Sequence, residues 1–99
     1  MITIEDIISY SKPHGNKING ARQTILKDDK VILSIVGGAS GLYGDFVEDF
    51  EIAVLDKENR SFITRFFRAD INDDVLPYQT KEQVEELANL LFKKGFQVG

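Results

Sequence analysis

Hydrophobic residues recur at helical spacing near the two ends of the chain and form strand-like runs between them. Near the N-terminus, Ile4, Ile7 and Ile8 stand at helical spacing, and Thr3 precedes them with Asp6 three positions later. A threonine in this position accepts a hydrogen bond from the backbone of the first helical turn. The pattern predicts an N-capped short helix that ends near Ser11.

A second helix, near the C-terminus, has clearer boundaries. Thr80 and Gln83 match the capping-box pattern, and Gly95 follows two lysines, as is typical of a glycine C-cap. One apolar stripe lies between these boundaries: Val84, Leu87, Ala88 and Leu91. We therefore predict an amphipathic helix that begins after Thr80 and covers one face of a sheet.

Two hydrophobic runs, residues 22–26 and 31–36, flank Asp28 and Asp29 and predict a β-hairpin. With a two-residue loop, Leu26 would face Val31. The second arm is apolar at five of its six positions, which favours an interior strand.

Two further runs, residues 50–55 and 61–68, surround a polar connector and predict a second hairpin. We take residues 57–59 as its loop, with Asn59 supplying the left-handed conformation that such loops need. The resulting register brings together several opposite-charge and apolar pairs. Among them are Glu51 with Arg65, Phe50 with Phe66, and Val54 with Phe62.

The remaining segment, residues 70–79, is predicted to be a connection, because Pro77 cannot donate a ladder hydrogen bond. The order of elements is α-β-β-β-β-α. We predict a single α+β domain over residues 1–99, with a four-stranded antiparallel meander sheet and two helices on one face. The opposite face would carry an apolar patch of the kind that often marks an interface, formed by Ala53, Leu55, Ile63 and Phe67.

Composition and charge narrow the function classes. The net charge of −4 weighs against nonspecific nucleic-acid binding, which depends on cations. The chain has no cysteine, no apolar run of the ~18 residues that a membrane helix needs, and acids near its start where a signal peptide carries bases. We therefore expect a cytoplasmic protein with no membrane partner and no direct nucleic-acid binding.

The glycine-rich stretch at residues 37–44 holds four of the eight glycines and is the most distinctive local feature. Its spacing matches neither a phosphate-binding loop nor a dinucleotide fingerprint, and it does not form a nucleophile elbow around Ser40. Apolar and acidic residues follow it, as in a surface with anchors and a charged border. We predict that this loop contacts a partner protein through Gly41, Leu42, Tyr43, Gly44, Asp45, Phe46, Glu48 and Asp49.

The other polar residues give weaker indications of a functional site than the glycine-rich loop does. His14, the single histidine, is surrounded by turn-forming residues and is interpreted as an exposed turn residue. Asp70, Asp73 and Asp74 lack the alternating spacing and closing glutamate of a calcium loop, and we interpret them as a solvated turn. We predict no catalytic residue, no metal site and no cofactor.

The segment from Ser34 to Phe46 and its continuation from Phe50 to Val54 resemble small uncharacterised proteins of phages and prophages of Gram-positive bacteria. The resemblance covers about the middle third of the chain and contains no motif of known chemistry. Such short phage proteins often act by binding, including inhibition of host enzymes or of CRISPR and other defence systems. The resemblance therefore implies binding to a host protein in the host cytoplasm, and it identifies no functional residue.

These observations favour a non-enzymatic protein-binding module, an inhibitor or adaptor that acts on a bacterial protein. In one version Asp45, Glu48 and Asp49 imitate nucleic-acid phosphates towards a basic groove of the partner. Two alternatives stay open. One is a small-ligand or nucleotide-binding domain that uses the amides of the glycine-rich loop. The other is a structural subunit that self-assembles through an open strand edge.

Overall fold

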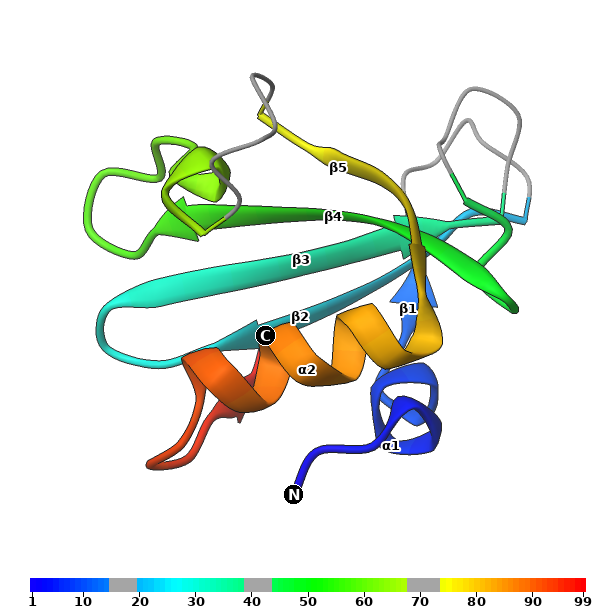
Figure 1. Cartoon of the computed structure of the whole chain (residues 1–99), viewed down its shortest axis with the longest axis horizontal. Helices are drawn as coiled ribbons and strands as arrows, with labels where there is room; N and C mark the ends of the chain where they lie inside the picture. Colours follow the sequence, from blue (N-terminus) through cyan, green and yellow to red (C-terminus); the bar gives the residue numbers. More distant parts are fainter. Residues whose placement is uncertain (15–19, 39–43, 68–73) are drawn as a thin grey trace.

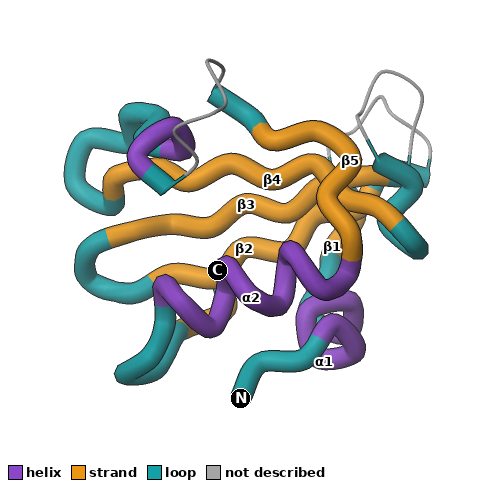
Figure 2. Tube along the Cα trace, in the orientation of Figure 1, coloured by secondary structure: helices purple, strands orange, loops and turns teal. Residues whose placement is uncertain are grey.

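The computed structural model describes residues 1–14, 20–38, 44–67 and 74–99. Its elements are α1 (Ile4–Ser9), β1 (Lys12–Pro13), β2 (Arg22–Lys27), β3 (Val31–Gly37), β4 (Asp49–Asp56), the short 3-10 helix η1 (Thr64–Phe66), β5 (Leu76–Thr80), α2 (Lys81–Leu91) and β6 (Gln97–Val98). The described strands form one antiparallel sheet in the order β1-β2-β3-β4-β5, with β6 paired to β2 (Figure 2). The predicted α+β class is confirmed, but the four-stranded meander is not.

Both predicted N-caps form, and each is a capping box, a pattern that we predicted only for Thr80 and Gln83. Thr3 Oγ1 accepts the N–H of Asp6 at 3.2 Å, and Thr80 Oγ1 accepts the N–H of Gln83 at 3.1 Å. Helix α1 ends at Ser9 and α2 ends at Leu91, so Gly95 lies beyond a further turn rather than at the helix end. None of the described helices is long and apolar enough to cross a membrane.

Both helices lie on the same side of the sheet (Figure 1), and the main core fills the space between. Thr24 ties α1 to this face, because its buried hydroxyl donates to the carbonyl of Ile7 at 2.6 Å. The fully buried side chains of the core come from both layers: Ile7, Leu26, Leu33, Ile35, Phe50, Val54, Val84 and Ala88. Alternation along the strands places these strand residues on one face, as the hydrophobic pattern predicts.

The predicted β2–β3 hairpin forms with a register two residues away from the expected one. Leu26 lies opposite Leu33 rather than Val31. Asp28 explains the shift, because its Oδ1 accepts the N–H groups of Lys30 and Val31 at 2.8 and 2.9 Å, and the turn therefore closes one residue later. A shift of two residues leaves every side chain on its predicted face.

The second predicted hairpin is wrong. After β4 the chain makes a single bridge, Leu55 with Phe62, and then turns into η1. Arg60, and not Asn59, adopts the left-handed conformation, with φ of 60°, so the loop is one residue longer than predicted. This slip of one residue removes the predicted pair of Val54 with Phe62, and the turn into η1 removes the predicted pairs of residues 64–66.

Strand β5 takes the place of the missing strand beside β4. Gln79 lies opposite Phe50 and Leu76 opposite Ile52, with a bulge between the two pairs. This segment was predicted to be a connection because of Pro77. The proline is accommodated because β5 is an edge strand, where a missing N–H need not break a ladder hydrogen bond.

Candidate functional site

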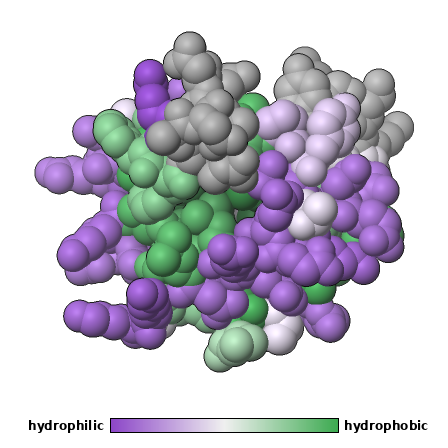
Figure 3. All heavy atoms as spheres, in the orientation of Figure 1, coloured by the Kyte–Doolittle hydropathy of each residue, from purple (hydrophilic) through white to green (hydrophobic). Residues whose placement is uncertain are grey.

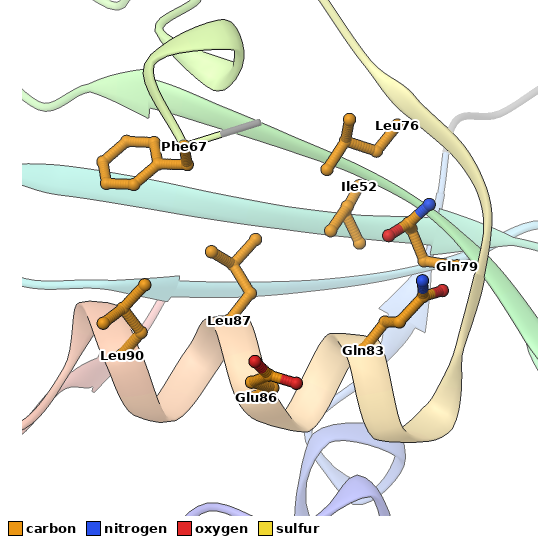
Figure 4. Close-up of a pocket in the computed structure, with 8 residues that line it drawn as sticks. All are labelled: Ile52, Phe67, Leu76, Gln79, Gln83, Glu86, Leu87 and Leu90. Atoms are coloured by element: carbon orange, nitrogen blue, oxygen red, sulfur yellow. The ribbon is translucent and has the colours of Figure 1, made fainter. Parts of the chain in front are cut away.

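An apolar groove runs along α2, between this helix and the β4–β5 side of the sheet (Figure 4). Its volume is about 350 Å³. Ile52 and Leu76 supply its deepest lining and are almost fully buried, whereas Leu87 and Leu90 of α2 approach it from one side and Phe67 from the other. The groove is therefore open to solvent above an apolar base.

Two amide side chains, Gln79 and Gln83, lie at one end of the groove (Figure 4). Thr80 is both the last residue of β5 and the N-cap of α2, so the strand passes into the helix without a loop. Gln83 Oε1 accepts the N–H of Thr80 at 2.8 Å, and Gln79 Nε2 donates to the carbonyl of Pro77 at 3.1 Å. These contacts fix both amides relative to the strand–helix junction.

The opposite wall depends on η1, which Thr64 anchors to β4. Thr64 is 1% exposed, and its Oγ1 accepts the N–H of Val54 at 2.9 Å and donates to the carbonyl of Asp74 at 2.6 Å. Ile63 and Phe67, on either side of η1, pack against the main core. One hydroxyl group thereby joins β4, η1 and the residues just before β5 around the groove.

Two apolar side chains of α2 and η1 are exposed. Leu90, which lines the groove, is 54% exposed, and Phe66 of η1, which does not line it, is 78% exposed. Figure 3 shows hydrophobic residues gathered on this face, in the region of η1 and α2. Single exposed apolar residues are ordinary, but apolar residues gathered beside a groove are typical of a binding surface.

The apolar patch predicted on the opposite face of the sheet does not form. Ala53 is buried, and Ile63 and Phe67 belong to the helix side of the molecule. The cause is the turn at η1, because a strand through these residues would have carried Phe67 to the other face.

The predicted partner-binding loop is described only from Gly44 onward, and Gly41, Leu42 and Tyr43 lie outside the described residues. Phe46 is 6% exposed and packs edge-on against Phe50, with ring centroids 5.2 Å apart. Phe46 is therefore a core residue rather than the surface anchor that we predicted.

Asp45 organises the turn that follows the glycine-rich stretch. Its Oδ1 accepts the N–H groups of Val47 and Glu48, both at 2.8 Å, and of Asp49 at 3.1 Å. These backbone hydrogen bonds, that from Val47 most strongly, lower the pKa of Asp45 to about 2. Asp49 Oδ1 in turn accepts the N–H of Asp45 at 2.7 Å. Both carboxylates thus stabilise the turn itself.

The described glycines of the loop permit close packing of backbone on backbone. A Cβ atom at Gly44 would lie 2.7 Å from the Cα of Phe50, and one at Gly38 would lie 2.5 Å from the carbonyl oxygen of Gly20. The N–H of Gly38 also donates to the carbonyl of Gly44 at 3.0 Å. Glycine is needed at these positions for the fold, whether or not a ligand binds.

The remaining polar candidates are not assembled into a site by the described structure. His14 is half-buried rather than exposed, with its Nδ1 3.1 Å from Gln23 Oε1. Asp70 and Asp73 lie outside the described residues, and Asp74 is exposed. Among the residues that the structure describes, no three histidine or carboxylate side chains lie close enough together to hold a metal ion.

Sequence reasoning missed the groove, although one signal was available. Leu90 lies outside the predicted stripe of α2, and with Leu87 and Leu91 it makes the apolar arc of the helix wider than the core requires.

Comparison of the chain with protein-family models, with curated proteins and with solved structures found no match.

Proposed function

We propose that this protein is a non-enzymatic binding module whose groove along α2 receives hydrophobic side chains of a partner protein. The observation that carries the proposal is the exposure of Leu90 on the wall of a groove that has Ile52 and Leu76 at its base. Removal of such apolar surface from water drives association without any catalytic group.

The acidic turn after the glycine-rich stretch extends the proposed surface. Glu48 Oε1 lies 3.5 Å from the Nζ of Lys81, the first residue of α2, and Asp49 lies opposite Thr80 in the sheet. The turn therefore borders the amide end of the groove. A partner seated in the groove would also meet Glu48, one of the loop residues that we predicted as a contact.

The kind of partner follows from the resemblance of the central segment to small phage and prophage proteins. We take the partner to be a bacterial protein in the host cytoplasm, such as an enzyme or a component of a defence system. On this proposal the protein acts by occupying a surface of that partner, as an inhibitor or adaptor.

Two structural observations favour this proposal over the alternatives. The described glycines and the carboxylates of the loop serve its own backbone, which leaves less of the loop for a nucleotide than an open glycine turn would offer. Strand-edge assembly is opposed by the short strands β1 and β6 beside β2, and by Pro77 and the bulge in β5.

The proposal is tested by selecting a random peptide library against the immobilised protein. Leu90→Ser is the test variant, and Ile8→Ser is the matched control, because Ile8 is an exposed aliphatic residue of the other helix and does not line the groove. Partial burial of a leucine side chain corresponds to about a tenfold change in affinity. We expect selected peptides to lose about tenfold in affinity for Leu90→Ser and to keep their affinity for Ile8→Ser.

Enrichment of no peptide, or of peptides that bind Leu90→Ser as well as the wild type, would refute the proposal. Thermal melts of both variants serve as the control for folding. A selective thermal shift with one member of a nucleotide panel would instead favour the small-ligand alternative.

A further inference from the structure

The length and direction of the groove follow α2. Gln83, Leu87 and Leu90 all line it and lie along one side of the helix (Figure 4). Seven residues separate the first of these from the last, which corresponds to about 10 Å at the rise of an α-helix. Apolar side chains at positions i, i+3 or i+4, and i+7 of a second helix span the same length.

A row of acids runs beside the groove on the solvent side of α2. Glu82 and Glu86 are one helical turn apart and exposed, and within the described part of the chain neither makes a hydrogen bond or an ion pair. Glu86 lines the groove and also an adjoining open hollow of about 800 Å³. Glu86 therefore stands on the ridge between an apolar surface and a second concavity.

The adjoining hollow has more acids than cations. Asp6, Glu82, Glu85 and Glu86 line it, against one cationic side chain, Lys93, and Met1 with its terminal amino group. Two of these acids have structural roles, since Glu85 Oε2 accepts the N–H of Ile4 at 2.6 Å and Asp6 takes part in the N-cap of α1. Glu82 and Glu86 remain as carboxylates without a described partner next to an apolar groove, an arrangement complementary to a cationic and apolar ligand.

We propose that the occupant of the groove is a basic amphipathic helix, which sets its apolar stripe between α2 and Phe67 and places Lys or Arg side chains over Glu82 and Glu86. This inference rests on the proposed function and names its partner class. The two-turn length of the groove matches an apolar helical stripe, and the parallel acidic row matches cations on the adjacent positions of the same helix.

The inference is tested with three synthetic helical peptides that share one apolar stripe and carry Lys, Gln or Glu at the flanking positions. A fourth peptide repeats the Lys sequence with a central proline, which prevents a continuous helix. Affinities are measured by fluorescence anisotropy at low and high ionic strength. The Glu82→Gln/Glu86→Gln variant is compared with Glu5→Gln/Glu58→Gln, which makes the same change in net charge at exposed acids that line neither concavity.

We expect the Lys peptide to bind about three- to tenfold more tightly than the Gln peptide at low salt, because two exposed ion pairs form. The Glu peptide should bind most weakly, and high salt should reduce the difference. The preference should vanish in Glu82→Gln/Glu86→Gln and persist in Glu5→Gln/Glu58→Gln. The proline peptide should lose most of its affinity.

Each contrary result has a distinct meaning. Equal binding of the three peptides, with all three still weakened by Leu90→Ser, would overturn the basic partner and leave the groove as the binding site. A Lys preference that survives Glu82→Gln/Glu86→Gln would overturn the assignment of those acids. Full affinity of the proline peptide would overturn the helical form of the ligand. Binding that ignores Leu90→Ser would overturn the proposed function itself.

Discussion

Replacement of Thr64 by valine would remove one hydroxyl group and keep the shape of the side chain. The hydroxyl accepts the N–H of Val54 at 2.9 Å and donates to the carbonyl of Asp74 at 2.6 Å. Val54 is fully buried, so its N–H would lose its partner in a place that water does not reach. A buried donor left unsatisfied costs about 1–3 kcal/mol.

Loss of the bond to Asp74 adds a smaller amount, because Asp74 is at the surface. We therefore expect Thr64→Val to lower the free energy of unfolding by about 2–3 kcal/mol, a large part of the stability of a small domain. For a chain of this size the midpoint of thermal unfolding should fall by about 10 °C or more.

Thr64→Ser is the matched control, because it keeps the hydroxyl and removes one methyl group at a cost of about 1 kcal/mol. Urea denaturation measures both free energies, with equal m-values as the check that the unfolded states are comparable. Hydrogen exchange at the Val54 amide should accelerate in Thr64→Val alone. If Thr64→Val matched the wild type in stability, or exceeded Thr64→Ser, the role assigned to the hydroxyl would be wrong.

Three further substitutions test other parts of the structure. Phe46→Ala should lower the free energy of unfolding by about 3–5 kcal/mol in urea denaturation, because a buried ring is lost. An unchanged free energy of unfolding would show that Phe46 is a surface residue and not part of the core. Arg60→Gly should raise the free energy of unfolding by about 0.5–1 kcal/mol, because glycine adopts the left-handed conformation without strain. Asn59→Gly should lower the free energy of unfolding, because Asn59 Oδ1 accepts the N–H of Ser61. Thermal melts in which Asn59→Gly is the more stable of the two variants would contradict the loop geometry. The pKa of Asp45 in the folded protein is lowered from 3.8 to about 2, so the charge of Asp45 stabilises the fold above pH 4 and this contribution is lost as the pH falls towards 2. The difference in thermal midpoint between the wild type and Asp45→Asn should therefore shrink between pH 4 and pH 2. A difference that stays constant over this range would argue against the lowered pKa.

Both helices could be predicted from the sequence because their signals are local. Each capping box joins residues three positions apart, Thr3 with Asp6 and Thr80 with Gln83, and the structure retains both. Hydrogen bonds of such short range form with little loss of chain entropy and need no help from the rest of the fold. The faces of β2 and β3 were predictable for a similar reason, because strand alternation is a local pattern.

The register of the first hairpin was harder to predict from the sequence, although the interaction that sets it is also local. Leu26 pairs with Leu33 because the Asp28 side chain captures two backbone N–H groups and sets where the turn closes. A two-residue loop one position earlier is equally compatible with the hydrophobic pattern. The choice between them is made by one side-chain hydrogen-bond acceptor.

The second neighbour of β4 was decided by the tertiary structure. Residues 61–68 have the better strand pattern, yet β5 pairs with β4 despite Pro77. Pairing with β5 buries Leu76 beside Ile52 and leads directly into α2, while the Thr64 hydroxyl satisfies the N–H of Val54. Competition of this kind depends on contacts between residues far apart in the chain, which no local window contains.

The groove forms because β4 pairs with β5 and not with residues 61–68. Leu87 and Leu90 were visible in the sequence as apolar residues of a helix, but their partner across the groove was not. Phe67 reaches the helix side because the chain turns at η1, and Phe46 enters the core because the turn around Asp45 directs it towards Phe50. The sequence by itself determined the helices, their caps and the buried faces of β2 and β3, since these rest on contacts a few residues apart. Only the tertiary structure decided which apolar residues were left exposed, since that depends on which distant segments exclude water from each other.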